Sequence, residues 1–342
     1  MHLSRGEILE AANIVLATGS RPMEIPGFPF SHPRIWSSDD ALALDEVPAR
    51  LAIVGGGVIG LELGTIYRRL GSDVTIIELM PDVLPTLDVD RRAVAAVKRG
   101  LGAVGIRILT GLSATSCEDR EDGLTITLSD GAALDVERVL IAVGRRPNSA
   151  DLGLETVGLE ADRRGRLAVG KGQATAAPGI YAIGDLAPGP MLAHKASAEG
   201  IAVAHVLAGS APHPVPTEAI PQVVFTDPEI ASVGLSETTA RATHRAVVVG
   251  RFPYAGLGKA LGMREPEGFF QVVADAADHR ILGVTVVGAE ASDLLAEGAL
   301  AVENGLTLEN VVKTVHAHPT LPEGFLEAAE NALGCGIHTV KR

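Results

Sequence analysis

The sequence of 342 residues predicts an α/β protein in which a doubly wound parallel sheet precedes a separate α+β domain. Between residues 50 and 144, short apolar strands alternate with helical segments, a pattern that is typical of a parallel sheet. From residue 222 onward, a group of strands is followed by a group of helices, which indicates an α+β domain.

The expected elements of the first part begin with a short buried strand over 13–18, a Pro-rich loop and a short helix capped near Ser37. They continue with a strand over 51–54, a helix over 58–70, a strand over 74–78, a helix over 88–101 with Asp88 as N-cap, and a strand over 106–109. Two Asp-Gly turns, at 122–123 and 130–131, predict a β-meander, and a buried strand over 139–144 closes the block.

The second part is expected to open with a strand over 180–183 and a helix over 194–208, and residues 208–216 read as a linker. The remaining expected strands are 222–225, 246–252, 269–274 and 281–287, and the remaining helices are 292–304, 308–315 and 323–333.

Composition excludes several classes of function. The formal charge is −13 and aromatic residues make up 3%, which argues against a nucleic-acid partner that needs clustered basic and stacking side chains. No run of about 18 apolar residues predicts a membrane span, and the N-terminal residues lack the apolar core of an export signal. A cytoplasmic protein is therefore expected.

The segment Gly55-x-Gly57-x-x-Gly60 lies between an expected strand and an expected helix. Glycines at this spacing allow a tight turn and let backbone N–H groups approach a pyrophosphate at the helix N-terminus. Glu78 ends the next strand, where a carboxylate accepts hydrogen bonds from an adenine ribose and repels a 2′-phosphate. The sequence therefore predicts a dinucleotide site that prefers NAD to NADP. The alternatives are a purely structural turn and, for Glu78, a solvated strand end.

Two further segments carry candidate chemistry. The strand that includes Tyr181 ends in Gly184-Asp185, and an acid at the carboxyl end of a strand suits ligand binding, although it is also a common helix cap. His318 precedes Glu323 by five residues. An imidazole can accept a thiol proton, and a carboxylate fixes its tautomer. The alternative for Glu323 is a capping box in which it binds the Thr320 N–H.

Together these motifs resemble the flavin-dependent disulfide reductases, and most closely the dihydrolipoamide dehydrogenase family, over about residues 10–335. The resemblance implies a Rossmann-like NAD domain and a partial FAD domain, plus a C-terminal α+β dimerisation domain. The implied boundaries are 1–47 and 148–215 for the FAD-domain segments, 48–147 for the NAD domain and 216–342 for the dimerisation domain. It further implies FAD and NAD as cofactors, no metal, a homodimer, and dihydrolipoamide on the lipoyl domain of a 2-oxoacid dehydrogenase complex as substrate and partner.

The resemblance also assigns roles to residues. His318 and Glu323 act on the dithiol, Asp185 holds the ribityl chain of the flavin, and the backbone at Ala193 meets the flavin. A structural role is expected for His316, and Glu62 is expected to pair with a Lys outside these residues. The implied cofactor-binding positions are Gly55, Gly56, Gly57, Val58, Ile59, Gly60, Glu78, Leu112, Ala142, Gly144, Arg145, Thr18, Gly19, Asp185 and Ala193.

The resemblance implies that the first half of the FAD domain, with its redox cysteine pair, is missing. Cys117 and Cys335 lie far apart, outside any CxxC or CxxxxC spacing, and are expected to be unrelated thiols. A truncated form that is inactive alone is therefore expected. The alternatives are a non-catalytic NAD-binding and dimerising fragment, or a reductase similar to glutathione reductase, mercuric reductase or soluble transhydrogenase.

Overall fold

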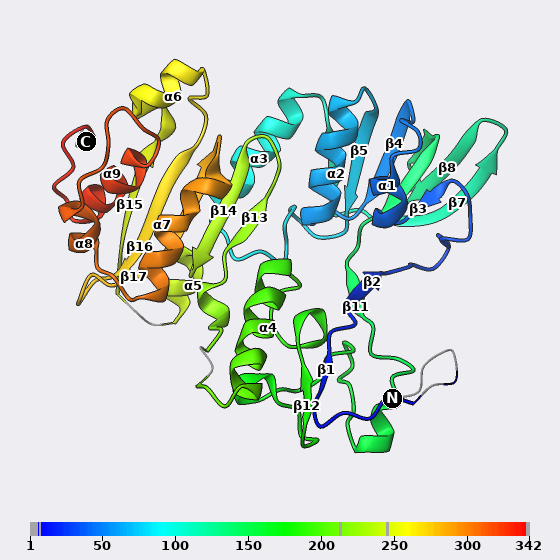
Figure 1. Ribbon diagram of the computed structural model, residues 1–342. Helices are drawn as coiled ribbons and strands as arrows, with labels where there is room; N and C mark the ends of the chain where they lie inside the picture. Colours follow the sequence, from blue (N-terminus) through cyan, green and yellow to red (C-terminus); the bar gives the residue numbers. More distant parts are fainter. Residues whose placement is uncertain (1–5, 7, 212–213, 244–245, 340–342) are drawn as a thin grey trace. The chain divides into compact units, whose positions relative to one another are not determined.

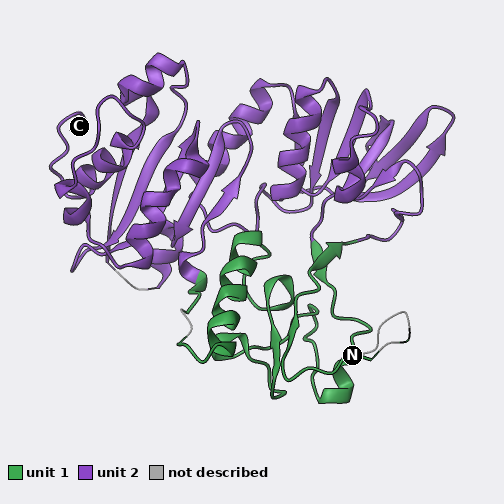
Figure 2. Cartoon of the chain, viewed as in Figure 1, with its two compact units in different colours: residues 1–23, 145–217 green, residues 24–144, 218–342 purple. Residues whose placement is uncertain are grey.

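The computed structural model describes residues 6, 8–211, 214–243 and 246–339. The chain divides into two compact units, each built from two segments (Figure 2). Unit 1 combines Met1–Met23 with Arg145–Thr217, and unit 2 combines Glu24–Gly144 with Glu218–Arg342. The N-terminal region that was searched for an export signal lies partly outside the described residues, which omit Met1–Arg5 and Glu7. The expected linker likewise includes two residues that are not described, Pro212 and His213.

The described residues of unit 1 form two small strand pairs and one long helix. β1 (Ile14–Leu16) pairs in parallel with β12 (Ile180–Ala182), β2 (Ser20–Pro22) pairs antiparallel with β11 (Arg145–Pro147), and α4 spans Ala193–Leu207. The expectation that residues 13–18 form a buried strand is wrong in part, because Val15 is 40% exposed. The physical reason is that β1 belongs to a two-stranded sheet and has one strand neighbour.

Unit 2 begins with the expected parallel sheet (Figure 1). Its strand order is β3 (Ile35–Trp36), β10 (Arg138–Ile141), β4 (Arg50–Val54), β5 (Asp73–Glu78) and β6 (Arg107–Thr110). Three helices accompany it: α1 (Ser38–Ala43), α2 (Val58–Arg69) and α3 (Arg91–Ala103). The β-meander is confirmed as an antiparallel sheet of β7 (Ala114–Arg120), β8 (Gly123–Leu128) and β9 (Ala133–Val136).

The expected start of α3 is wrong. The helix begins at Arg91, and the N-cap is Asp90, whose side chain accepts a hydrogen bond from the Arg92 N–H at 2.8 Å. Asp88 instead accepts hydrogen bonds from the Ser236 N–H at 3.2 Å and the Thr239 hydroxyl at 2.8 Å. Asp88 therefore binds two residues about 150 positions later in the sequence and does not cap the helix.

The second part of unit 2 is an antiparallel sheet with helices, as expected (Figure 1). The strand order is β13 (Gln222–Val224), β14 (Glu229–Gly234), β17 (Ile281–Gly288), β16 (Phe269–Asp275) and β15 (Val247–Pro253). Its helices are α5 (Glu237–Ala242), α6 (Gly258–Met263), α7 (Ala291–Glu303), α8 (Leu308–Lys313) and α9 (Glu323–Ala332). β14, α5 and α6 were absent from the expected elements.

The two segments of unit 2 share one hydrophobic core. Val224, Ile230 and Val287 from the antiparallel sheet pack in the same buried cluster as side chains of α2, α3 and β5. An ion pair between Arg69 and Asp227, 2.6 Å long, crosses the same boundary. Within the described residues, no helix combines the length and apolarity that a bilayer crossing requires.

Candidate functional site

The glycine turn between β4 and α2 brings backbone atoms unusually close together. Gly55 has φ +115°, and a Cβ there would lie 2.4 Å from the Ala142 carbonyl oxygen. A Cβ on Gly60 would lie 2.0 Å from the Gly55 carbonyl oxygen. Backbone cannot move aside as a flexible side chain can, so the fold itself requires glycine at these two positions.

Gly57 differs from Gly55 and Gly60, because a Cβ there would meet no protein atom within 4 Å. Its φ of −77° is open to any residue, so the fold gives no reason for glycine. Gly57 is also the N-cap of α2, and no side chain caps that helix end. Free N–H groups beside an open space form the arrangement that binds a phosphate at a helix N-terminus.

Glu78 lies at the end of β5 and is 6% exposed, so the alternative of a solvated strand end is wrong. Its Oε2 accepts a hydrogen bond from the Gly56 N–H at 2.6 Å, and its Oε1 accepts one from the Met80 N–H at 2.7 Å. An ionised carboxylate offers about four acceptor positions, so two are left for hydroxyl groups. Glu78 therefore holds the glycine turn and still presents negative charge.

A cavity of about 600 Å³ opens between the glycine turn and the end of β10. Its lining includes these positions of the predicted NAD site: Gly55, Gly57, Val58, Ile59, Glu78, Leu112, Ala142 and Gly144. Gly56 and Gly60 lie behind this surface, against the Glu78 side chain and the Gly55 carbonyl respectively. Arg145 is outside the lining and belongs to unit 1.

The second candidate site surrounds Asp185 in unit 1. The Asp185 Oδ2 accepts a hydrogen bond from the Ser20 hydroxyl at 2.5 Å. The Arg145 guanidinium donates to the Ser20 hydroxyl and to the Ser20 carbonyl, both at 2.8 Å. The carboxylate is thus placed to accept hydroxyl hydrogen bonds, which is the chemistry that a ribityl chain offers. The Arg145 side chain therefore contacts Ser20 beside Asp185.

The other predicted flavin positions lie in the same unit. Asn148 holds the Thr18-Gly19 segment, since it exchanges hydrogen bonds with Thr18 and its N–H donates to the Gly19 carbonyl at 2.9 Å. Ala193 is exposed and is the first residue of α4, whose N-terminus has no side-chain cap. Exposed N–H groups at a helix start favour electron-rich ligand atoms.

The third candidate site is the segment that precedes α9. The His318 Nδ1 lies 2.8 Å from Glu323 Oε1, and Glu323 Oε2 accepts the Thr320 N–H at 2.8 Å. One carboxylate therefore binds both His318 and the Thr320 N–H, but the capping box is not formed, because the N-cap of α9 is Pro322 and the Thr320 hydroxyl donates to the Ala317 carbonyl oxygen. Burial opposes ionisation of Glu323, but the hydrogen bonds from Thr320 and His318 lower its pKa below the usual value. The His318 side chain is 76% exposed, so its Nε2 edge is open to a reactant.

His316 has a different environment from His318. Its side chain is 5% exposed, with Nε2 at 3.0 Å from Glu297 Oε1 and Nδ1 at 3.0 Å from the Thr314 carbonyl oxygen. Both ring nitrogens are occupied by internal partners. This agrees with the structural role expected for His316.

Two further expectations concern Glu62 and the cysteines. Glu62 Oε1 accepts a hydrogen bond from the Phe225 N–H at 2.9 Å, and burial raises the pKa of Glu62 against the effect of this bond. Cys117 is half-buried and Cys335 is exposed, and both are free thiols. Desolvation and the nearby Asp119 raise the pKa of the Cys117 thiol, which disfavours the reactive thiolate.

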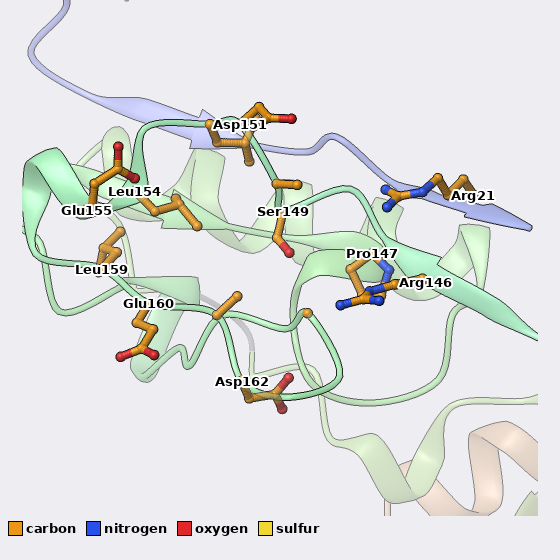
Figure 3. Close-up of a pocket in the computed structure, with 14 residues that line it drawn as sticks. Arg21, Arg146, Pro147, Ser149, Asp151, Leu154, Glu155, Leu159, Glu160 and Asp162 are labelled. Carbon is orange, nitrogen blue, oxygen red and sulfur yellow. The ribbon is translucent and has the colours of Figure 1, made fainter. Parts of the chain in front are cut away.

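Another cavity, of about 550 Å³, lies in unit 1 (Figure 3). Figure 3 shows Arg21 and Arg146 on one side of it and Glu155 and Glu160 on the other. None of the predicted site residues lines it. Arg21 is held by Asn148, whose Oδ1 accepts from its guanidinium at 2.9 Å.

Comparison with known families gives two matches along this chain. Residues 2–200 match the family described as pyridine nucleotide-disulphide oxidoreductase. Residues 220–329 match the dimerisation domain of the same family. The second match covers the antiparallel sheet and most of its helices, including His318 and Glu323.

Curated relatives are similar over nearly the whole chain. The dihydrolipoyl dehydrogenase of Halobacterium salinarum is 45% identical over 340 residues, which cover 98% of this chain and 71% of the relative. The dihydrolipoyl dehydrogenase of Geobacillus stearothermophilus is 44% identical over 333 residues, which cover 96% of this chain and 70% of the relative.

Solved structures of flavoproteins are similar as well. LpdA from Mycobacterium tuberculosis superposes with a TM-score of 0.90 at 29% identity, covering 96% of this chain and 72% of that one. The HOCl-induced flavoprotein disulfide reductase RclA from Escherichia coli superposes with a TM-score of 0.85 at 27% identity, covering 93% of this chain and 73% of that one.

Proposed function

Because the chain belongs to the pyridine nucleotide-disulphide oxidoreductase family, we propose that it functions as a dihydrolipoyl dehydrogenase-type flavoprotein, an oxidoreductase that uses FAD and NAD. The observation that carries the dithiol part is the His318–Glu323 pair. An exposed imidazole whose inner nitrogen is held by a carboxylate suits proton transfer with a thiol at its outer nitrogen.

We propose a task for each side chain of this pair. The neutral imidazole donates its Nδ1–H to Glu323 Oε1, so the lone pair lies on the exposed Nε2. Nε2 accepts the proton of a substrate thiol, and the thiolate that remains is the nucleophile for disulfide exchange. Glu323, whose pKa is lowered, stays ionised and stabilises the imidazolium that forms. His318 is thus the proposed acid–base residue, and Glu323 is its orienting partner.

The cofactor positions are proposed from family membership and geometry together. Bound FAD supplies the electron relay between dithiol and nicotinamide, and bound NAD supplies the hydride acceptor. The residues present fit both groups: Gly57 leaves open space at the uncapped start of α2, and Asp185 accepts hydroxyl hydrogen bonds. On the dinucleotide side, the proposal comprises Gly55, Gly56, Gly57, Val58, Ile59, Gly60, Glu78, Leu112, Ala142 and Gly144. On the flavin side, it comprises Thr18, Gly19, Asp185 and Ala193, joined by Arg145, which contacts Ser20 beside Asp185.

The proposed physiological setting follows the family. The match of residues 220–329 to the dimerisation domain supports a homodimer. Dihydrolipoamide on the lipoyl domain of a 2-oxoacid dehydrogenase complex is the proposed substrate and partner, and the cytoplasm is the proposed compartment. Size-exclusion chromatography with light scattering tests the dimer, and cell fractionation tests the compartment.

The positions of the two cysteines determine what activity we expect from this chain. Neither Cys117 nor Cys335 has a thiol partner, so these residues alone do not provide a dithiol relay. We expect the 342-residue chain, supplied with FAD, to show no reduction of NAD by dihydrolipoamide above the free-flavin background. A chimera that adds the part of the Geobacillus stearothermophilus relative that this chain does not cover is expected to restore turnover.

The two arms of the test separate the candidate functions. Turnover by the chimera, lost again in its His318→Gln variant, would support the dehydrogenase. A chimera that binds both cofactors and forms a disulfide but gives no turnover would favour the alternative of a non-catalytic NAD-binding and dimerising protein. Turnover by the chain alone would contradict the cysteine argument.

A further inference from the structure

Lys195 and Glu199 form a buried ion pair on α4. They lie one helical turn apart, their side chains are 2% and 4% exposed, and Lys195 Nζ lies 2.9 Å from Glu199 Oε1. Removing two charges from water is costly, and apolar residues of similar volume often give equal or greater stability. The pair therefore needs a reason beyond the stability of α4.

Both side chains also bind the backbone of Gly184. Lys195 Nζ donates to the Gly184 carbonyl oxygen at 2.9 Å, and Glu199 Oε2 accepts the Gly184 N–H at 2.7 Å. The ion pair thus occupies both polar backbone groups of a single buried residue. Gly184 has φ +67°, a left-handed conformation that glycine adopts without strain.

The lysine stem also reaches the loop between Asp185 and α4. A Cβ on Gly189, which has φ +105°, would lie 3.0 Å from Lys195 Cε. The stem therefore fills the space beneath the loop, while its charged end holds the residue before Asp185. Side chains of α4 thus hold the backbone of this segment, and Ser20 binds its Asp185 carboxylate.

We propose that Lys195 and Glu199 are positioning residues for flavin binding: by holding both backbone groups of Gly184 they fix the place and direction of the Asp185 carboxylate. This inference rests on the proposed function, in which Asp185 binds the ribityl chain. The pair itself does not touch the flavin. Its effect passes through one backbone residue, because the orientation of a peptide unit sets the direction of the side chain that follows it.

Two double variants of the full chain separate this role from plain stability. Lys195→Glu with Glu199→Lys keeps an opposite-charge pair but turns the wrong group toward each polar atom of Gly184. Lys195→Met with Glu199→Leu removes the charges and keeps the volume, so the protein is expected to stay folded. Leu159→Ala serves as the control, since it removes a buried apolar side chain of unit 1 that makes no side-chain hydrogen bond.

The readouts are flavin affinity, from fluorescence titration with FAD, and amide hydrogen exchange over residues 183–192. We expect both double variants to bind FAD about tenfold more weakly or worse, the scale of a lost hydrogen bond to a charged group. Exchange at Gly184 should rise in the same variants, whereas Leu159→Ala should lower the melting temperature and leave both readouts near wild type. In an Asp185→Ala background, the double variants should weaken FAD binding no further.

The outcomes are distinguishable from those of the proposed function. If wild-type chain does not bind FAD, the flavin assignment fails, and hydrogen exchange still decides whether the pair holds Gly184. Slow exchange at Gly184 in the Met/Leu variant would overturn the proposal. So would an equal loss of FAD affinity in Leu159→Ala, or a further loss in the Asp185→Ala background.

Discussion

The turn at Gly55–Gly60 and the segment at Gly184–Asp185 both lead the chain from the carboxyl end of a strand toward a helix that has no side-chain cap. In both, a glutamate carboxylate accepts a glycine N–H: Glu78 from Gly56 and Glu199 from Gly184. The first turn is shaped by backbone atoms in close approach, whereas the second is held by a buried ion pair. The two strand ends that we propose as ligand sites are thus stabilised by different means.

The difference determines what a substitution does. In the glycine turn the constraint is steric, and the clash that a Cβ would make differs between Gly55, Gly57 and Gly60, so each position has its own consequence. In the Gly184 segment the constraint is electrostatic and comes from a helix that starts nine residues after Gly184, so the proposed flavin position depends on side chains that do not themselves touch the ligand. The following predictions test this contrast, from the largest expected effect to the smallest.

Among substitutions in the glycine turn, Gly60→Ala should reduce the stability of the protein most. A Cβ there would lie 2.0 Å from the Gly55 carbonyl oxygen, so Gly60→Ala should lower the free energy of unfolding by about 3 kcal/mol, the upper end of overpacking costs. Gly57→Ala, with open space around its Cβ, should cost less than about 1 kcal/mol and instead weaken NAD binding. Urea unfolding and NAD titration measure the two effects. Equal destabilisation by both variants would contradict the separation of roles.

Glu323 resembles Glu78 and Glu199 in that its carboxylate accepts a backbone N–H, here that of Thr320, but its other oxygen holds the His318 side chain. The second prediction concerns this proposed dithiol site. In a catalytically competent chimera, His318→Gln should slow flavin reduction by dihydrolipoamide by roughly 100-fold, a common scale for acid–base catalysis. His316→Gln should slow it much less, because the His316 ring is occupied by internal partners. Rapid-mixing spectroscopy of the flavin measures this step. A larger effect at His316 would show that the roles are reversed.

The relative affinity for NAD and NADP tests the proposed role of Glu78. Glu78 keeps a buried negative charge beside the cavity, so we expect NAD to bind about tenfold more tightly than NADP, since like charges within a few ångströms repel. Calorimetric titration with both nucleotides gives the ratio. Equal affinities, or tighter binding of NADP, would remove the specificity argument while leaving the structural bonds of Glu78 to Gly56 and Met80 intact.

The smallest predicted effect is the pH dependence of Glu323. Its pKa is lowered in the folded protein from a reference of 4.5, so the bonds of the carboxylate stabilise the fold above that value and are lost as the pH falls through the lowered pKa. The stability difference between wild type and Glu323→Gln should therefore shrink from pH 6 to pH 3. It should amount to about 1 kcal/mol or less for this partly exposed group. Chemical unfolding across that range is the measurement, and a difference that grows toward acid pH would refute the sign.

Local sequence patterns predicted most of the elements and the glycine turn, and the resemblance added further positions that line the cavity beside it. The Asp-Gly turns that flank β8 and the spacing of the glycines before α2 are short-range patterns, which is why they are visible in the residues. The GxGxxG pattern by itself is weak evidence for a dinucleotide site, because the same pattern, Gly100-x-Gly102-x-x-Gly105, occurs at the end of α3. There Gly100 accommodates the Asp227 carbonyl, 2.2 Å from where a Cβ would lie.

What the sequence did not predict depends on contacts between distant segments. Asp88 was assigned as a helix cap because its bonds to Ser236 and Thr239 leave no local signal. The i, i+4 spacing of Lys195 and Glu199 predicts a pair on a helix, but not that both bind Gly184. Arg145 was expected among the cofactor-binding residues from the resemblance, but the pairing of β11 with β2 that brings its side chain to Ser20 has no local signal.

Unit 2 is built from two chain segments that are separated by residues of unit 1, and this order affects the chain during synthesis. Residues 24–144 carry apolar side chains that are covered later by Val224, Ile230 and Val287, and residues 145–217 emerge from the ribosome in between. At about 5–20 residues per second, this interval lasts roughly 4–15 s. Throughout it, part of the apolar surface of the nascent segment stays uncovered, and exposed surface of this kind favours aggregation before the later segment is made.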